Sequence, residues 1–307
     1  MTFPLSASVV KRALVVAAFA AALLISLGSA AERRVLLIAG PPSHGPGEHE
    51  HNAGVLLLQK CLSSVPELKT SVSLNGWPTD PAVFDGVDAV VFISDGGRRH
   101  PALQANSLSI LQPLIARGIG FALIHFAIEP TANEGKAEFL QWAGGFFETN
   151  WSVNPLWEAT FEDLPSHPIT RGVRPFTLKD EWYYHLRFAE DKTGFTPLLV
   201  AIPTAETLTR PDGPHEGNPA VRAAVAREEP QILSWALERA DGGRSFGFTG
   251  GHFHRNWAHD DFRKLVLNGI AWIAKVEVPT KGIASAVTAD DLEKNLDEKK
   301  KKPAPKP

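Results

Sequence analysis

Short apolar runs alternate along this chain with segments whose apolar residues recur every three or four positions, and this alternation limits the fold more than any other feature. Runs of the strand type span residues 34–39, 88–94, 119–126 and 244–250. Segments with helical spacing span residues 52–64, 103–118, 136–145 and 259–275. Strands and helices that alternate in this way form a mostly parallel sheet with helices on both faces. The sequence therefore predicts an α/β protein with three layers and a doubly wound, mostly parallel sheet.

The alternation weakens in the middle of the chain. We interpret residues 151–190 as a loop-rich insertion that contains one or two strands. Pro113 interrupts one predicted helix, and His259 or Asp260 lies near the predicted cap of the last one. Three further strands are predicted after the insertion, at residues 197–203, 220–226 and 231–238.

The N-terminus has the three parts of a secretory signal peptide. Lys11 and Arg12 precede an apolar run that extends from Ala13 to about Leu27, and small residues follow it. We predict that residues 1–31 are this signal and that the protein is exported, either to the periplasm or outside the cell, with no stable membrane insertion after cleavage. An uncleaved membrane anchor is the alternative, although the run is short for a membrane span.

The mature protein must be stable without an internal disulfide, since Cys61 is the only cysteine of the chain. We assign residues 32–279 to one domain, and residues 280–307 to a short helix followed by a disordered tail rich in lysine and proline. The net charge of −3 gives no reason to expect a nucleic acid as partner. We also expect no nucleotide cofactor.

Polar loops follow several of the predicted strands. In a sheet of this kind ligands bind at the carboxyl ends of the strands. Four loops would bring histidine or carboxylate side chains to that one edge, which indicates a functional site there. The loops after the strands are residues 43–51 and 95–101, the turn at His125, and residues 251–257; the insertion adds residues 180–185, and a long connection adds residues 210–218.

Two pairs of histidines have the spacing of ligands to a single metal ion. His49 and His51 flank Glu50, and His252 and His254 are likewise two residues apart. In extended backbone each pair points to one side, so the four rings are candidate ligands for a divalent metal ion. The pairs match no standard zinc motif, and solvated loop histidines are the alternative interpretation.

The candidate catalytic residues are His125, Asp180 and Glu181. His125 ends a predicted strand where related folds carry a serine or cysteine nucleophile, and an imidazole there can act as a base or a ligand. Asp180 and Glu181 are adjacent, so we expect one of them to be a general base and the other to bond to backbone or arginine. A buried histidine that bonds only to backbone is the alternative for His125.

These motifs resemble those of the ThuA-like (trehalose utilisation) family. The resemblance extends over about residues 33–276 and lies in the loop SHGPGEHEH, the strand GFALIH, and the motifs HPITRG, DEWYYH and GGHFHRNW. It implies a flavodoxin-like sheet similar to that of class I glutamine amidotransferases, without the cysteine nucleophile. It also implies a role in carbohydrate catabolism, on keto-sugars or keto-glycosides.

The resulting hypothesis is an enzyme that removes a proton next to the carbonyl of a keto-sugar, leading to isomerisation, elimination or cleavage. A non-catalytic carbohydrate-binding or scaffold protein and a metallohydrolase of another substrate remain as alternatives. The partner that we expect is a small carbohydrate. Its candidate contacts are His44, Trp151, Trp182, His185, Arg210 and Asn256.

Overall fold

The computed structural model describes residues 31–299, so nearly all of the predicted signal peptide lies outside the described residues. Its centre is a seven-stranded sheet in the order β2-β1-β3-β4-β11-β10-β9. The first five strands in that order run parallel, and β10 is antiparallel to both of its neighbours. The strands are β1 (Arg33–Ala39), β2 (Leu68–Ser73), β3 (Ala89–Ile93), β4 (Gly120–Ile124), β9 (Phe195–Ala201), β10 (Gln231–Glu238) and β11 (Arg244–Phe248).

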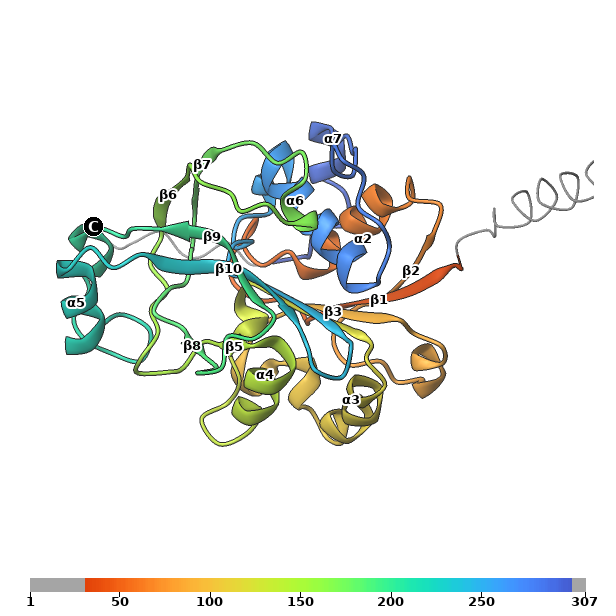
Figure 1. Ribbon diagram of the computed structural model, residues 1–307, viewed down its shortest axis with the longest axis horizontal. Helices are drawn as coiled ribbons and strands as arrows, with labels where there is room; N and C mark the ends of the chain where they lie inside the picture. The colour runs from red at the N-terminus through yellow and green to blue at the C-terminus, as the bar shows by residue number, and fades with distance from the viewer. Residues whose placement is uncertain (1–30, 300–307) are drawn as a thin grey trace, which may run out of the picture. The chain divides into compact units, whose positions relative to one another are not determined.

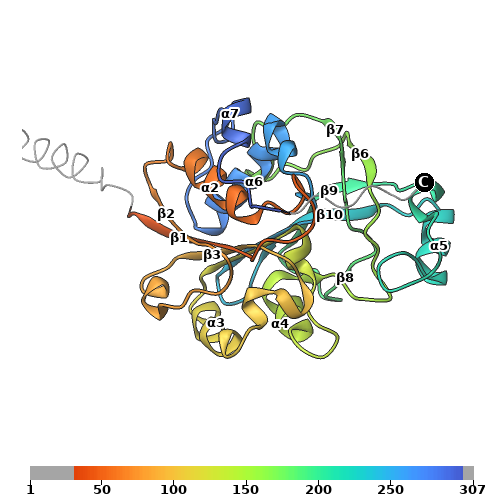
Figure 2. The ribbon, with the colours of Figure 1, turned by 180° about the vertical axis from the view of Figure 1, so that it is seen from behind.

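Helices cover both faces of this sheet (Figure 1; Figure 2). One face carries α2 (His51–Leu62), α6 (Asp260–Ile273) and α7 (Ala289–Leu292), and the other carries α3 (Ser107–Ala116) and α4 (Lys136–Ala143). The predicted three-layer α/β fold with a mostly parallel sheet is therefore confirmed.

The continuous apolar runs of the sequence reflect burial of the strands on both faces. In β1, Val35 and Leu37 pack into the core beneath α2 and α6, whereas Leu36 and Ile38 pack into the core beneath α3 and α4. All four side chains are at most 1% exposed. Because neither face of a central strand meets water, the run has no polar alternation.

Residues 220–226 were predicted as a strand, and this prediction was wrong. They lie in α5 (Pro219–Ala226), whose first turn is capped by Asn218, with its side chain accepting from the backbone N–H of Val221 at 3.0 Å. Asparagine followed by proline is a helix-start signal, and it decides the structure of an alanine-rich segment. Strand β2 was not predicted, since it lies at the edge of the sheet and is largely polar.

The insertion contains more strands than the one or two that were expected. Two of them, β6 (Trp157–Phe161) and β7 (Phe176–Asp180), form an antiparallel pair. A third strand of the insertion, β8 (Arg187–Phe188), pairs with β5 (Gly145–Phe146), which precedes the insertion. Strand β7 ends at Asp180, so the insertion delivers the DEWYYH motif toward the edge of the sheet that carries the polar loops.

The segment after α6 packs against the domain up to the last described residue, Lys299. Asn268 of α6 is fully buried and accepts from the backbone N–H of Ile283 at 2.9 Å. Helix α7 is the short helix that was predicted, and Thr288 caps it. Residues 293–299 belong to the segment that was predicted as a disordered tail, yet the side chain of Lys299 is almost completely buried.

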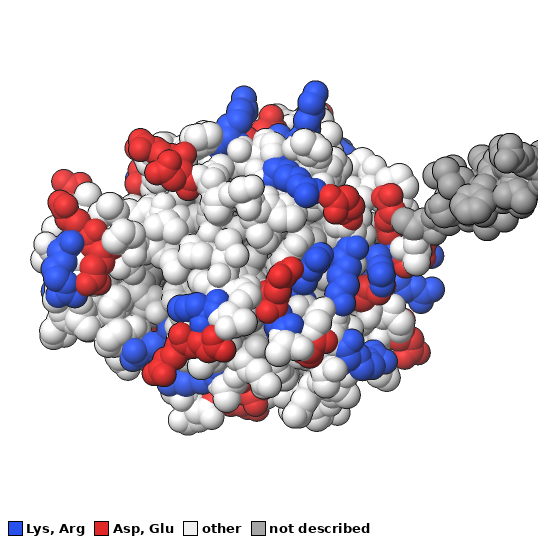
Figure 3. Space-filling view, in the orientation of Figure 1, with Lys and Arg blue, Asp and Glu red and all other residues white. Residues whose placement is uncertain are grey.

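Charges of both signs mix on the face shown in Figure 3. Neighbouring opposite charges pair on the surface, as Arg33 does with Asp88 at 2.9 Å. Within residues 31–299, no helix has the length and apolar character that crossing a bilayer requires.

Candidate functional site

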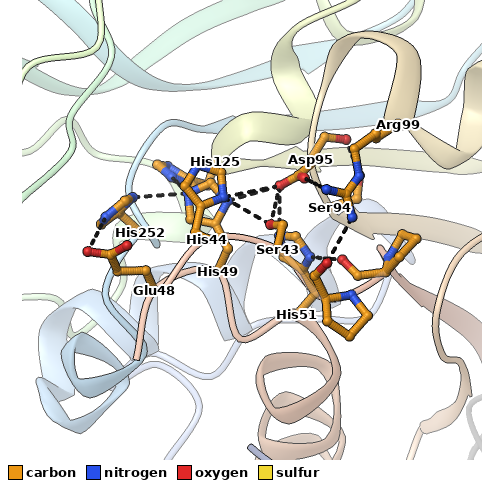
Figure 4. A network of polar contacts seen from close by, with 12 residues as sticks. Ser43, His44, Glu48, His49, His51, Ser94, Asp95, Arg99, His125 and His252 are labelled. Carbon is orange, nitrogen blue, oxygen red and sulfur yellow. Dashed lines mark hydrogen bonds and ion pairs between the residues drawn. The ribbon is translucent and has the colours of Figure 1, made fainter. Parts of the chain in front are cut away.

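Side chains from four separate segments converge at the carboxyl edge of the sheet. His49 comes from the loop after β1, His125 directly follows β4, Glu181 follows β7, and His252 follows β11. One potential ligand atom from each lies within 4.8 Å of the other three. We call these four residues the His–Glu cluster; Figure 4 shows its three histidines.

The distances inside the His–Glu cluster are short. Nε2 of His49 lies 3.0 Å from Nδ1 of His252 and 3.1 Å from Nε2 of His125. Oε2 of Glu181 lies 3.2 Å from Nδ1 of His252 and 3.5 Å from Nε2 of His125. Four potential ligand atoms thus lie around one point in space. Burial opposes a charge on His252, but its contact with Glu181 raises the pKa of His252 above the usual value.

Two of the cluster's histidines stand in the left-handed backbone region. His125 has a φ of 58° and His49 a φ of 46°. For a residue with a Cβ this conformation costs ~1–2 kcal/mol, so it persists only where the surrounding contacts impose it. The turn at His125 matches the predicted sharp strand end, and it aims the ring into the cluster.

Hydrogen bonds on the far side of each ring fix which nitrogen carries the proton. Nδ1 of His49 lies 3.0 Å from the carboxylate of Asp95, and Nδ1 of His125 lies 2.7 Å from the carbonyl of Thr249. Both partners only accept, so each Nδ1 donates. Burial lowers the pKa of His49 well below its usual range and that of His125 to about 3, so both rings are neutral at pH 7.

It follows that no proton lies between the two Nε2 atoms. A neutral imidazole has one N–H, and in both rings it is used on Nδ1. Two lone pairs therefore face each other at 3.1 Å inside a buried site. They need a cation between them, or donors such as Nδ1 of His252 and the hydroxyl of Tyr183, which lie 3.0 and 3.3 Å from the two nitrogens. The residues present fit a bound cation.

Asp180 does not lie among the cluster atoms. Its buried carboxylate accepts from the backbone N–H groups of Gly251 and His252 at 2.9 and 3.0 Å, and from Nδ2 of Asn256 at 3.0 Å. These bonds fix the loop that carries His252. The predicted division of labour between the adjacent acids thus has a structural counterpart, with Glu181 in the cluster and Asp180 bonded to backbone. Asn256, predicted as a sugar contact, supports the same loop.

The structure separates the predicted histidine pairs. Nδ1 of His51 lies 3.2 Å from the carbonyl of Pro41, and its Nε2 is 3.7 Å from Asp95. His254 lies near Glu50 and the backbone of Leu292, and neither ring nitrogen makes a hydrogen bond of ordinary geometry. Only one histidine of each pair enters the cluster, because His51 is the first residue of α2 and His254 is the first residue of a short 3-10 helix. The alternative of solvated loop histidines is wrong, since all four are buried.

Two of the predicted sugar contacts are engaged elsewhere. Trp182 is fully buried against Phe248 and Phe262, so no sugar face can stack on it in this structure. The ring of Trp151 stacks on His185 at 4.3 Å, and the guanidinium of Arg187 lies 3.6 Å from its centroid.

His44 and Arg210 lie closer to the cluster. The ring of His44 stacks on that of His49 with 3.6 Å between centroids. Arg210 donates to Oδ1 of Asn154 at 2.8 Å, and Nδ2 of Asn154 reaches Oε1 of Glu181 at 3.3 Å. A ligand that approaches from the surface would meet His44 and Glu181 first, since their side chains are 35% and 14% exposed.

Sequence reasoning missed the residues that support the cluster. Asp95 orients His49, and the buried hydroxyl of Tyr183 lies 3.1 Å from Oε2 of Glu181 and 3.3 Å from Nε2 of His125. Nearby, Glu129 accepts from His215 at 3.0 Å. The position of Asp95 directly after a buried strand was the available signal; nothing in the sequence indicated the pairing of residues as distant as Glu129 and His215.

The tautomers provide a direct test of this geometry. In protein stripped of metal by chelator, we expect ¹⁵N spectra of the imidazoles to show His49 and His125 protonated on Nδ1. His100 is an internal control with the opposite tautomer, because its Nδ1 accepts from Ala102 and its Nε2 donates to the carbonyl of Ala127. Protonation of either cluster ring on Nε2 would contradict the facing lone pairs.

Comparison with known proteins agrees with the fold and the motifs. The profile of the ThuA family, described as trehalose utilisation, matches residues 34–273. The crystal structure of a ThuA-like protein from Bacteroides uniformis is similar in fold, with a TM-score of 0.56 and 14% sequence identity over 81% of this chain and 94% of that one. No curated protein matches in sequence. Because the family profile covers most of the described domain, this chain belongs to the ThuA family.

Proposed function

We propose that this protein is an exported, metal-dependent enzyme of carbohydrate catabolism that removes a proton next to the carbonyl of a keto-sugar or keto-glycoside. The observation that carries the metal is the close approach of Nε2 of His49 to Nε2 of His125, two acceptors with no proton between them. The observation that carries the chemistry is a carboxylate, Glu181, beside the same point.

The donor set suits a divalent transition metal. Imidazole nitrogens and a carboxylate bind such ions at ~2.0–2.2 Å, which places neighbouring ligand atoms about 3.0–3.5 Å apart. Four of the distances between ligand atoms in the cluster are 3.0, 3.1, 3.2 and 3.5 Å. The carboxylate of Asp95 and the carbonyl of Thr249 supply the outer hydrogen bonds that orient metal-binding histidines.

We assign the three histidines to metal binding and Glu181 to proton transfer. Three protein ligands are the usual number in catalytic sites, where a further position stays open to substrate. Glu181 differs from the histidines in reaching the surface, since its side chain is 14% exposed. A bound divalent ion supplies Lewis acidity that polarises a carbonyl oxygen.

In this assignment Glu181 takes the proton from the carbon next to the carbonyl. The C–H electron pair moves into the C–C bond, and the carbonyl oxygen takes the negative charge. The hydrogen bond from Tyr183 to Oε2 of Glu181 at 3.1 Å holds the carboxylate in place, and Asn154 holds its other oxygen. A proton returned to a neighbouring carbon gives isomerisation, and loss of a leaving group gives elimination or cleavage.

The proposal of a sugar substrate is based on family membership and on the polar surroundings of the cluster. The family description is trehalose utilisation. His44, Arg210 and Asn154 offer hydrogen-bond donors around Glu181, as recognition of hydroxyl groups requires.

Metal content should depend on the cluster and not on the sequence pairs. We expect His125→Ala and His252→Ala to lose bound metal, measured by elemental analysis of protein purified without added ions, while circular dichroism shows a folded domain. His254→Ala is the matched control and should retain the ion. A wild-type protein without any divalent metal affinity would overturn the enzyme proposal and favour a carbohydrate-binding role.

Proton abstraction can be followed separately from metal binding. Glu181→Gln should keep three nitrogen ligands and bind metal, yet it should exchange the proton next to the carbonyl at least ~100-fold more slowly, because the amide cannot act as a base. The measurement is deuterium incorporation from D₂O into a panel of keto-glycosides, followed by NMR. Equal exchange in Glu181→Gln and wild type would remove Glu181 from this role.

Export is proposed from the N-terminal sequence, whose pattern of basic, apolar and small residues is that of a cleaved signal. Mass spectrometry of the protein recovered from its native compartment should show a chain that starts at Ala31 or Glu32. An intact Met1 in envelope fractions would instead indicate a membrane-anchored protein.

A further inference from the structure

Residues 288–299, which we call the C-terminal strap, lie against the loop that carries His49. Helix α7, at the start of the strap, packs next to α2 (Figure 1). Lys60 of α2 pairs with Asp291 at 2.6 Å, and Asn52 at the start of α2 donates to Asp297 at 2.8 Å. The strap therefore follows α2 toward its N-terminus, where the loop that carries His49 ends.

The strap ends in a buried ion pair. The side chain of Lys299 is 3% exposed, and its Nζ lies 3.2 Å from Oε1 of Glu50, whose side chain is 1% exposed. Nζ also donates to the carbonyl of His49 at 3.1 Å and to the carbonyl of Glu48. The ammonium group has three N–H donors, and each has an acceptor here.

The position of this ammonium group is electrostatically unfavourable apart from its pairing with Glu50. It lies at the N-terminal end of α2, where the helix dipole favours anions and not cations. Burial of the charge adds a further cost, which the carboxylate of Glu50 must offset. Glu50 is in turn held by the backbone N–H of Asp297 at 2.9 Å and that of Gly47 at 2.8 Å.

These contacts act on the backbone of a cluster residue. His49 has a φ of 46°. Lys299 donates a hydrogen bond to the carbonyl of this strained residue. The preceding carbonyl, that of Glu48, is held by the same ammonium group. Lys299 of the strap is thus hydrogen-bonded to the peptide groups on both sides of the His49 Cα.

We propose that Lys299 is a positioning residue for the metal centre: by holding the carbonyls of Glu48 and His49, it fixes the backbone that presents Nε2 of His49. The inference rests on the proposed metal binding and adds to it a contribution from the C-terminal strap. Without this contact, the loop can leave the left-handed conformation at His49, and the ring then no longer faces His125 and His252.

The test compares two lysines of the same strap in the full-length protein. Lys299→Met removes the buried ammonium group with little change in side-chain length. Lys294→Met removes an exposed ammonium group, which forms an ion pair with Asp291 at 3.3 Å. With Co²⁺ as the probe, we expect Lys299→Met to bind at least ~10-fold more weakly and to show an altered visible spectrum. Lys294→Met should match the wild type in both.

Lys299→Met leaves Glu50 buried without its partner, which could unfold the loop. The double variant Glu50→Gln, Lys299→Met removes both charges, so it keeps the test valid if the single variant does not fold. It still lacks the donors to the two carbonyls, and we expect it to bind Co²⁺ as weakly as the single variant.

The outcomes separate the two proposals. Wild-type affinity and spectrum in a folded Lys299→Met or double variant would overturn the positioning role and leave the proposed function standing. A wild-type protein that does not bind Co²⁺ would overturn the proposed function together with this inference. Weak binding confined to the Lys299 variants, with ¹⁵N signals of the His49 ring shifted and those of His100 unchanged, would support the role.

Discussion

The hydrogen bond between Asp95 and Nδ1 of His49 determines how the site works, because it decides which nitrogen faces the other histidines. With the proton held on Nδ1, the opposite nitrogen presents a lone pair to His125 and His252. The carbonyl of Thr249 imposes the same arrangement on His125. The acceptors that set the tautomers lie outside the His–Glu cluster, yet they turn the lone pairs of both Nε2 atoms into it, as the proposed metal binding requires.

A second requirement is that two of the four segments hold an unfavourable backbone conformation. His49 and His125 are left-handed, and the loop that presents His252 is fixed by the three hydrogen bonds that Asp180 accepts from it. Every residue of β4, directly before His125, is buried, so the scaffold that opposes relaxation there is tightly packed. The strain is therefore concentrated at the edge of the sheet where the chemistry is proposed.

Sequence patterns were sufficient for the fold, and two of the four histidines predicted as metal ligands, His49 and His252, lie in the His–Glu cluster. Buried parallel strands and amphipathic helices differ clearly in period, so the α/β architecture and the loops at its edge were predictable. The pairing of His49 with His51, and of His252 with His254, failed because it assumed that both members lie on extended backbone, whereas His49 is left-handed and His51 and His254 each begin a helix. Asp95 had a signal in its position after a buried strand, but its pairing with His49 had none, and the role of Tyr183 likewise depends on contacts between residues distant along the chain.

The four cluster residues, at positions 49, 125, 181 and 252, span about two-thirds of the chain. No contiguous fragment much shorter than the whole domain contains all of them. Each residue follows a different strand. The cluster can therefore form only after the central strands and the insertion have assembled, which makes it one of the last and most non-local parts of the molecule to form during folding. Metal capture would then report completed folding, and an ion present at that stage would bind the native state in preference to any partly folded one.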